Sequence, residues 1–423
     1  MTAAISLERR LASLRSARSV AREDRTAVAP GRPRGRDRAV ELAMAIDAVV
    51  IETPRGRYVR RDVPPTVAPL DRIRLATLPG LPPVDAPLVC LDIETTGLAI
   101  AAGTIAFLVG VGWWEHDQFH CVQLVVPDQP DEPAMLEALA ELLPPDAWLV
   151  TYNGRGFDWP LLEARFRMDG RAAPRHLGHL DLLPFVRRVF RHRLSDARLR
   201  TVERELLGIG RTGDVEGAEI PGRYLDYLQG GSPRPLQEVA RHNVRDILSL
   251  AALLSHIDTA LADPARRSAA NEGDLVALAH LYRRERRHEE ALGCLDAALG
   301  SGSHPPIVAE RARTLRRLGR HAEALAAWRS IVTSGGSLTA VALVEIAKAL
   351  EHTWSDPASA LDVVDRGRLL AERGRALGRP MPALEADLTR RRRRLVDRLR
   401  RRSGGGDRAG RKRVRDPTSN GVP

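Results

Sequence analysis

A short apolar run, Leu88–Leu91, constrains the fold most strongly, because two acidic residues, Asp92 and Glu94, follow it directly and a glycine stands at position 97. The apolar run predicts a buried β-strand, and residues two apart on a strand point to the same face. Asp92 and Glu94 therefore leave the sheet together, and the glycine permits a sharp turn after them. The chain is expected to form a sheet with two carboxylates at the end of one strand.

Two further acids occur in contexts that direct them toward the same place. Asp158 follows a second apolar strand at 147–153, after the turn 154–156, at the start of a helix. Asp246 lies within 235–258, where apolar residues recur at helical spacing. His242 precedes Asp246 by one helical turn, so both side chains share one face of that helix.

Four carboxylates that meet at one point repel one another unless they take up protons or bind cations. Hard divalent ions with oxygen ligands meet this need, and two of them about 4 Å apart activate water and stabilise the leaving oxygen of a phosphodiester. A histidine such as His242 suits the role of proton acceptor, because imidazole exchanges protons near neutral pH. Taken singly, the Asp92 and Glu94 pattern often arises by chance, Asp158 is equally well explained as a helix cap, and Asp246 as the partner of a nearby arginine. The set of four predicts a two-metal nuclease site.

Several ordered segments between 88 and 257 resemble DnaQ-like exonucleases of the ribonuclease H-like superfamily, in particular the bacterial YprB-type ribonuclease H-like domain proteins. The segments that carry the resemblance are 91–97, 103–108, 152–154, 157–162, 179–183, 213–221 and 242–246.

The resemblance implies a 3′–5′ exonuclease that binds nucleic acid, DNA or RNA, and uses two Mg²⁺ or Mn²⁺ ions. By the same resemblance Asp92 and Glu94 form the first exonuclease motif, Asp158 the second and Asp246 the third, and all four bind metal. It further implies that Thr95, Thr96 and Asn153 contact the substrate strand. The catalytic residues would be these four acids with His242 as general base.

The spacing at His242 departs from the pattern of the family. Members with a histidine base place it five residues before the last aspartate, and members with a tyrosine base place it four residues before. His242 stands four residues before Asp246. The general base is therefore assigned by residue type and not by motif spacing.

Asp181 and Asn153 each have a structural interpretation as well. Asp181 precedes the apolar stretch 182–186, so it is either a fifth acid near the site or the cap of the next helix, and the preference of Asp for helix starts favours the cap. The Asn153–Gly154 step predicts a tight turn at a strand end.

The remainder of 88–258 is typical of an α/β domain. Segments 104–114 and 119–126 are rich in strand-forming residues and predict a hairpin, 133–143 has helical periodicity, and 148–152 predicts another strand. We therefore expect a ribonuclease H-like mixed sheet flanked by helices, with the ligand site at the strand ends.

From about residue 271 the sequence predicts an all-α region. Arg-His-Glu-Glu-Ala-Leu at 287–292 recurs as Arg-His-Ala-Glu-Ala-Leu at 320–325, an offset of 33 residues, and an Ala-Leu step follows 36 residues later. This period resembles the tetratricopeptide repeat, so 271–374 is expected to form tetratricopeptide-like helical repeats. Such repeats either bind a partner protein or only cap the preceding domain.

Both ends of the chain are basic. Residues 1–40 carry ten Arg against four acids, and 390–423 carry fourteen Arg or Lys against three, so the body between them is acidic although the whole chain has a formal charge of +11. We expect disordered tails there, which either tether a phosphate backbone or are simply solvated. Between the first tail and the nuclease-like region, 41–87 is expected to be a lead-in with a short hairpin at Arg55–Gly56 and a Pro-rich linker.

Composition excludes several other classes of protein. The sequence contains no apolar run of membrane-spanning length and no apolar segment typical of a secretory signal. Three scattered cysteines are too few for a disulfide framework or a zinc site. A cytoplasmic bacterial protein without membrane contact is expected. The alternative to a nuclease is a non-catalytic nucleic-acid-binding or scaffold protein that acts through its helical repeats.

Overall fold

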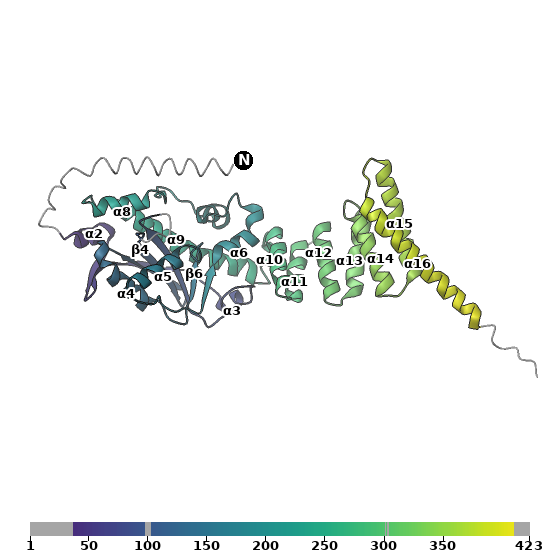
Figure 1. The fold of residues 1–423 in the computed structure, drawn as a ribbon, viewed down its shortest axis with the longest axis horizontal. Helices are drawn as coiled ribbons and strands as arrows, with labels where there is room; N and C mark the ends of the chain where they lie inside the picture. Colours follow the sequence, from purple (N-terminus) through teal and green to yellow (C-terminus); the bar gives the residue numbers. More distant parts are fainter. Residues whose placement is uncertain (1–36, 98–102, 301, 303, 410–423) are drawn as a thin grey trace, which may run out of the picture.

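The computed structural model describes residues 37–97, 103–300, 302 and 304–409. A sheet-containing body is followed by a row of helices (Figure 1). The body holds a seven-stranded sheet of order β1-β2-β5-β4-β3-β6-β7 in which β3, β6 and β7 are parallel and the other neighbours antiparallel. The strands are β1 (Val49–Thr53), β2 (Gly56–Val67), β3 (Leu88–Thr95), β4 (Ala106–Glu115), β5 (Gln118–Val125), β6 (Trp148–Thr151) and β7 (Gly178–Asp181). This mixed sheet with helices confirms the predicted fold class.

The apolar residues of β3 divide between two hydrophobic cores, one on each face of the sheet. Cys90 belongs to the core that contains α6 (Leu182–Val189) and α9 (Leu236–Ile257), whereas Leu91 packs with α4 (Glu132–Leu142) and α5 (Asp158–Met168). Because Asp92 and Glu94 continue the alternation of Cys90, they lie on the face covered by α9.

Two glycines of β4 allow α9 to lie close against the sheet. A Cβ atom at Gly110 would stand 2.3 Å from Oδ1 of Asn243, and one at Gly112 would stand 2.7 Å from Ile247. Any larger residue would therefore push α9 outward. The absence of side chains at these positions sets the distance between α9 and the strand that carries Asp92.

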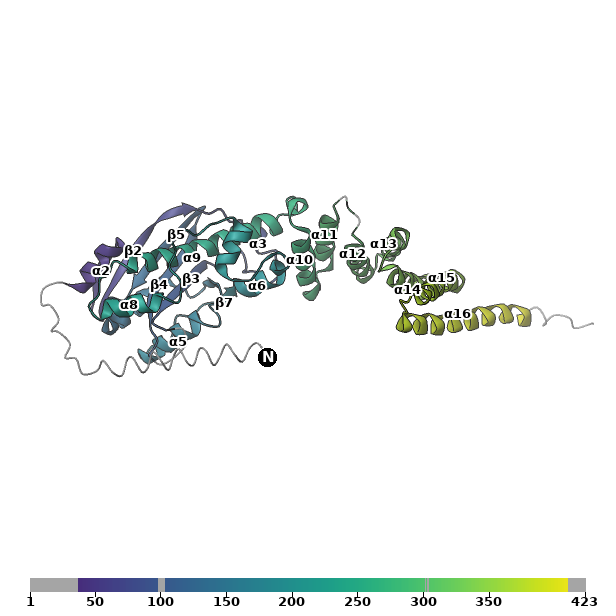
Figure 2. The ribbon, with the colours of Figure 1, turned by 90° about the horizontal axis from the view of Figure 1, so that it is seen from above.

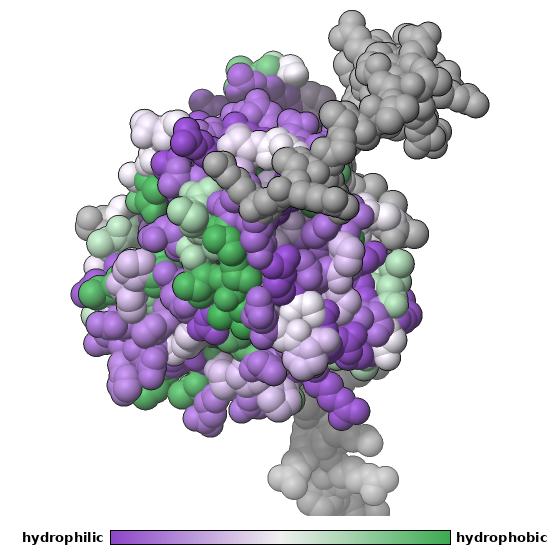
Figure 3. Space-filling model, turned by 90° about the vertical axis from the view of Figure 1, so that its left-hand side faces the viewer, coloured by the Kyte–Doolittle hydropathy of each residue, from purple (hydrophilic) through white to green (hydrophobic). Residues whose placement is uncertain are grey.

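The segment 41–87 contributes more than the lead-in expected from the sequence. Its predicted hairpin at Arg55–Gly56 is present, and β2 continues along β5, with the Pro64–Pro65 pair at the irregularity between Val63 and Thr66. Proline is tolerated in a sheet at such a bulge. The helix α2 (Arg38–Ile46) packs on the same sheet and lies with α8 (Ile220–Leu228) at one end of the body. That end is mostly hydrophilic around one compact apolar patch (Figure 3).

The C-terminal region consists of consecutive helices that pack in sequence. The helices are α10 (Glu272–Arg284), α11 (His288–Leu299), α12 (Pro305–Arg317), α13 (His321–Ser334), α14 (Thr339–His352) and α15 (Pro357–Ala376). The helices α11 and α13 begin 33 residues apart, at His288 and His321, as the sequence period predicts. Both ribbon views place α10 beside α6 (Figures 1 and 2).

The basic C-terminal segment differs from the expected disorder, because α16 (Pro382–Ala409) is helical. Leu388 and Leu395 of α16 are buried in the core of the last helices, and Arg394 makes two hydrogen bonds of 2.7 and 2.6 Å to Glu351 on α14. Arginine and leucine both favour helices, and burial of the leucine face outweighs repulsion between the arginines. The rest of this tail, 410–423, and residues 1–36 of the other tail lie outside the described residues. Among the described helices, none is long and apolar enough to cross a membrane.

Candidate active site

The parallel pairing of β3, β6 and β7 brings three chain segments to one edge of the sheet. Cys90 pairs with Val150 and Thr151 pairs with Asp181, so the turn after β6 begins beside Asp92. That turn leads into α5, whose first residue is Asp158. The register therefore places the acids of β3 next to the start of α5.

The turn before α5 gives Asp158 its position. Asn153 adopts a left-handed backbone with φ 69°, which confirms the predicted tight turn. A Cβ atom at Gly154 would stand 2.7 Å from Oδ2 of Asp158, so the carboxylate lies directly over this glycine. Burial, together with the nearby charges of Asp181 and Asp246, raises the pKa of Asp158 to about 7.

A buried chain of amides holds Asp92. Asn243 of α9 donates from Nδ2 to Oδ2 of Asp92 at 2.8 Å, and its Oδ1 accepts a 2.8 Å hydrogen bond from Nε2 of Gln123. Both amide residues are fully buried. Sequence reasoning missed Asn243, although it lies one residue after His242 and three before Asp246 on the same helix.

Burial and neighbouring acids together raise the pKa values of Asp92, Glu94 and Asp158. Burial raises the pKa of Asp92 well above its usual range, and the charges of Asp246, Glu94 and Asp158 raise it further. The pKa of Glu94 is raised in the same way, by burial and then by Asp246 and Asp158. These acids therefore form one electrostatic unit whose ionised form requires a compensating cation.

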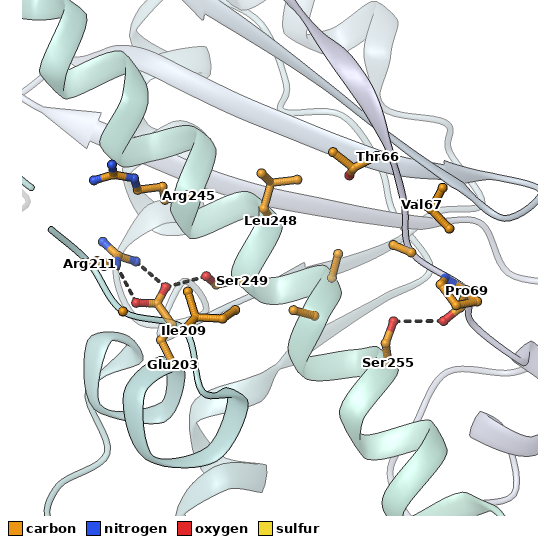
Figure 4. A pocket seen from close by; sticks show the side chains of 14 residues that line it. Thr66, Val67, Pro69, Glu203, Ile209, Arg211, Arg245, Leu248, Ser249 and Ser255 are labelled. Atoms are coloured by element: carbon orange, nitrogen blue, oxygen red, sulfur yellow. Dashed lines mark hydrogen bonds and ion pairs between the residues drawn. The ribbon is translucent and has the colours of Figure 1, made fainter.

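A single arginine already touches one member of this unit. Arg211 contacts Asp246, pairs with both carboxylate oxygens of Glu203, and lies 2.8 Å from Oδ2 of Asp214, while its side chain is only 6% exposed. The hydroxyl of Ser249 also donates to Glu203, and Figure 4 shows this group beside a cavity of about 500 Å³ between α9 and the end of β2.

His242 is oriented by Asp214. Its Nδ1 lies 3.0 Å from Oδ2 of Asp214, and its Nε2 lies 3.8 Å from Oδ2 of Asp246. We assign the ring proton to Nδ1, because the carboxylate of Asp214 accepts a hydrogen bond there. Burial alone would raise the pKa of Asp214, but hydrogen bonds from Arg211 and His242 lower it to about 2, so Asp214 is ionised. This leaves Nε2 of His242 as a proton acceptor that faces Asp246.

Four other predicted residues have structural roles at the edge of the site. Thr95 donates from its hydroxyl to the carbonyl of Gly97, and the hydroxyl of Thr96 accepts from the backbone of Ile105. Asp181 accepts from the backbone N–H groups of Leu183 and Asn153, which confirms the predicted helix cap. The side chain of Asn153 is exposed.

The oxygen atoms of the four acids suit a hard divalent cation, although the side chains are not arranged as a completed coordination shell. Within the described part of the chain, no group of three or more His, Cys, Asp or Glu side chains has the spacing of a formed metal site. The four acids nevertheless supply only oxygen donors, which Mg²⁺ and Mn²⁺ prefer, and burial raises the pKa of all four, with neighbouring acids adding to the rise at Asp92, Glu94 and Asp158.

Comparison with known proteins agrees with this fold. Residues 89–258 match the model of the RNase H superfamily, so the chain contains an RNase H-like domain. Such a domain suggests a nuclease that acts on nucleic acid, and RNase H-like nucleases generally use divalent metal ions.

The chain is also similar to the uncharacterized protein YprB of Bacillus subtilis (strain 168). The two are 29% identical over 280 residues, which is 65% of this chain and 67% of the relative. The similarity therefore extends beyond the length of the RNase H-like domain alone.

Proposed function

We propose that this chain is a metal-dependent nuclease of the 3′–5′ exonuclease type that hydrolyses phosphodiester bonds by a two-metal mechanism. The observation that carries the proposal is the convergence of Asp92, Glu94, Asp158 and Asp246, from one strand and two helices, into a half-buried group in which burial and neighbouring acids raise the pKa values of the first three.

In this proposal each residue of the site has a distinct task. The four acids would hold two Mg²⁺ or Mn²⁺ ions, which when bound supply an activated water and stabilise the leaving oxygen. Nε2 of His242 accepts the proton of the attacking water, and the hydrogen bond between Nδ1 and Asp214 fixes the orientation of the ring. Thr95, Thr96 and Asn153 lie at the exit of β3 and the turn after β6, where they would contact the substrate strand.

The test is cleavage of end-labelled single- and double-stranded DNA and RNA with Mn²⁺, with Mg²⁺ and with EDTA. Labels at the 5′ and 3′ ends report polarity, because a 3′–5′ exonuclease releases the 3′ label first and shortens the 5′-labelled strand stepwise. Glu94→Gln removes one proposed ligand and should lower cleavage about 100-fold or more. Glu115→Gln changes a carboxylate that is 63% exposed at the end of β4 and should not change the rate. Cleavage that persists in EDTA, or in Glu94→Gln, would contradict the proposal.

A second candidate is a protein that binds nucleic acid without cleaving it. The contact of Arg211 with Asp246 favours this candidate, because one acid already has a cationic partner. Binding of the same substrates without cleavage in Mn²⁺ would support it over the nuclease.

The exposed arginines of α16 provide a separate prediction about binding. Residues 382–401 contain eight Arg and three acids, and Arg393, Arg400 and Arg401 are exposed. Truncation at residue 390 would remove the buried Leu395, so we expect a cleaner result from replacing these three arginines with glutamine. Affinity for nucleic acid should fall, and the slope of log K against log salt should flatten by about 1 for each phosphate that the protein no longer neutralises. An unchanged slope in a filter-binding titration would show that α16 does not bind the backbone.

A further inference from the structure

We propose that Arg211 is the positioning residue that fixes the orientation of both Asp246 and His242. This inference rests on the proposed nuclease function, since those two side chains are its third metal-ligand motif and its general base. It concerns a residue outside all four acidic positions, on the segment between Gly208 and α8.

Arg211 reaches both side chains through one guanidinium group. Its Nη2 contacts Oδ1 of Asp246, which leaves Oδ2 facing His242. Its Nη1 donates to Oδ2 of Asp214 at 2.8 Å, and the same oxygen lies 3.0 Å from Nδ1 of His242. Asp246 is thus held from one side and His242 from the other, and the atoms left facing one another are the two that the mechanism uses.

The guanidinium of Arg211 is itself held in place by the buried carboxylate of Glu203. Glu203, whose side chain is 1% exposed, binds Nε and Nη2 of Arg211, and Ser249 of α9 donates to Glu203 (Figure 4). A planar guanidinium makes such paired contacts with fixed geometry, which a lysine ammonium does not. Ser249, which binds Glu203, and Asp246, which contacts Arg211, both lie on α9. The two ends of this chain of contacts therefore keep a fixed position relative to each other.

Two glycines with a left-handed backbone lie on either side of Arg211 and allow the chain to turn there. Gly208 and Gly213 have φ values of 70° and 64°, which favour glycine, and they flank Arg211 in sequence. The short segment between them leads the chain from the π-helix Glu203–Leu207 toward α8.

The test measures metal binding by its effect on thermal unfolding, independently of cleavage. In Arg211→Met the Mn²⁺ concentration at half-maximal stabilisation should rise at least about tenfold, as is usual when a partner of a metal ligand is removed. Arg211→Lys keeps the positive charge but lacks the planar guanidinium group, so its Mn²⁺ concentration at half-maximal stabilisation should lie between those of wild type and Arg211→Met. Arg165→Met is the matched control, because Arg165 also forms a largely buried pair, with Glu132, between α4 and α5; its Mn²⁺ midpoint should stay within about twofold of wild type.

Loss of Arg211 leaves Glu203 without its cation and can unfold the chain. The double substitution Arg211→Met with Glu203→Met removes both charges, and its control is Arg165→Met with Glu132→Met. A folded double variant should still show the weakened Mn²⁺ response, and a folded variant with a wild-type Mn²⁺ midpoint would overturn the inference.

Cleavage rates separate this inference from the proposed function. If wild type responds to Mn²⁺ and cleaves, and the Arg211 variants match it in both, only the role of Arg211 is refuted. A wild-type chain without any Mn²⁺ response would refute the metal-dependent nuclease, and the role of Arg211 with it.

Discussion

Replacing Asp92 with asparagine is expected to reduce metal-dependent cleavage about 100- to 1,000-fold, the usual cost of losing one charge-stabilising group in an active site. The amide has the shape of the carboxylate, and its oxygen can still accept the hydrogen bond from Nδ2 of Asn243. The substitution therefore removes a negative charge without opening a cavity. Initial rates on a labelled strand in Mn²⁺ measure the effect.

Asp62→Asn is the matched control for this substitution. Asp62 lies on β2 of the same sheet, its side chain is 63% exposed, and it pairs only with Arg60 among the ion pairs of the described chain. This variant should cleave at the wild-type rate. Thermal unfolding in EDTA should show both variants folded. Wild-type cleavage by the Asp92 variant would remove Asp92 from the set of metal ligands.

The second large effect concerns stability and pH in the absence of metal. The pKa of Asp158 is about 7 in the folded chain against an ordinary value of 3.8, so the neutral form stabilises the fold. This contribution is complete below about pH 4 and is lost as the pH rises through 7, with a size on the order of 2 to 4 kcal/mol. In EDTA, the melting temperature of wild type should therefore fall by several degrees between pH 5 and pH 8.

Asp158→Asn isolates this contribution, because asparagine cannot ionise. Its melting temperature in EDTA should exceed that of wild type at pH 8, and the difference should shrink toward pH 5. Addition of Mn²⁺ at pH 8 should reverse the order, since the cation binds the ionised carboxylate and stabilises the folded state. Parallel wild-type and Asp158→Asn curves across this pH range would show that Asp158 is not part of a buried acidic group. Asp62→Asn again serves as the exposed control.

Local patterns in the sequence were sufficient for the elements that form the acidic site. The apolar run before Asp92 predicted β3, the Asn153–Gly154 step predicted the turn before Asp158, and helical periodicity predicted the helix that carries Asp246. The strands β4 and β5 were predicted equally well, because both segments are rich in residues that favour strands and only a short turn separates them. These elements are determined by contacts between residues that are near one another in the sequence.

The missed features depend on contacts between distant parts of the chain. Arg211 meets Asp246 across 35 residues, and Gln123 meets Asn243 across 120, so no local pattern marks either pair. The role of β2 was missed because its sequence contains several charged residues and two prolines, which are unusual within a strand. Pairing with the distant strand β5 stabilises it as a strand nevertheless. The helix α16 was not predicted because its many arginines are typical of a disordered basic tail. Only its buried leucines distinguish it from such a tail.

The hydrophobic core of α6 and α9 does not end with the RNase H-like domain. It continues through Leu278 of α10 and Leu295 of α11 to Ile307 of α12, and the buried Asp274 of α10 accepts from Arg193 at 2.6 Å. The core of the later helices is a second cluster that includes Val308 of α12, and Leu292 of α11 packs with Leu315 of α12 in a third. A fragment cut where the superfamily match stops would leave a wide apolar face in water and would tend to aggregate. Because Ile307 of α12 is the last member of this core in the sequence, a fragment of the RNase H-like part keeps the core covered only if it extends through α10 and α11 into α12.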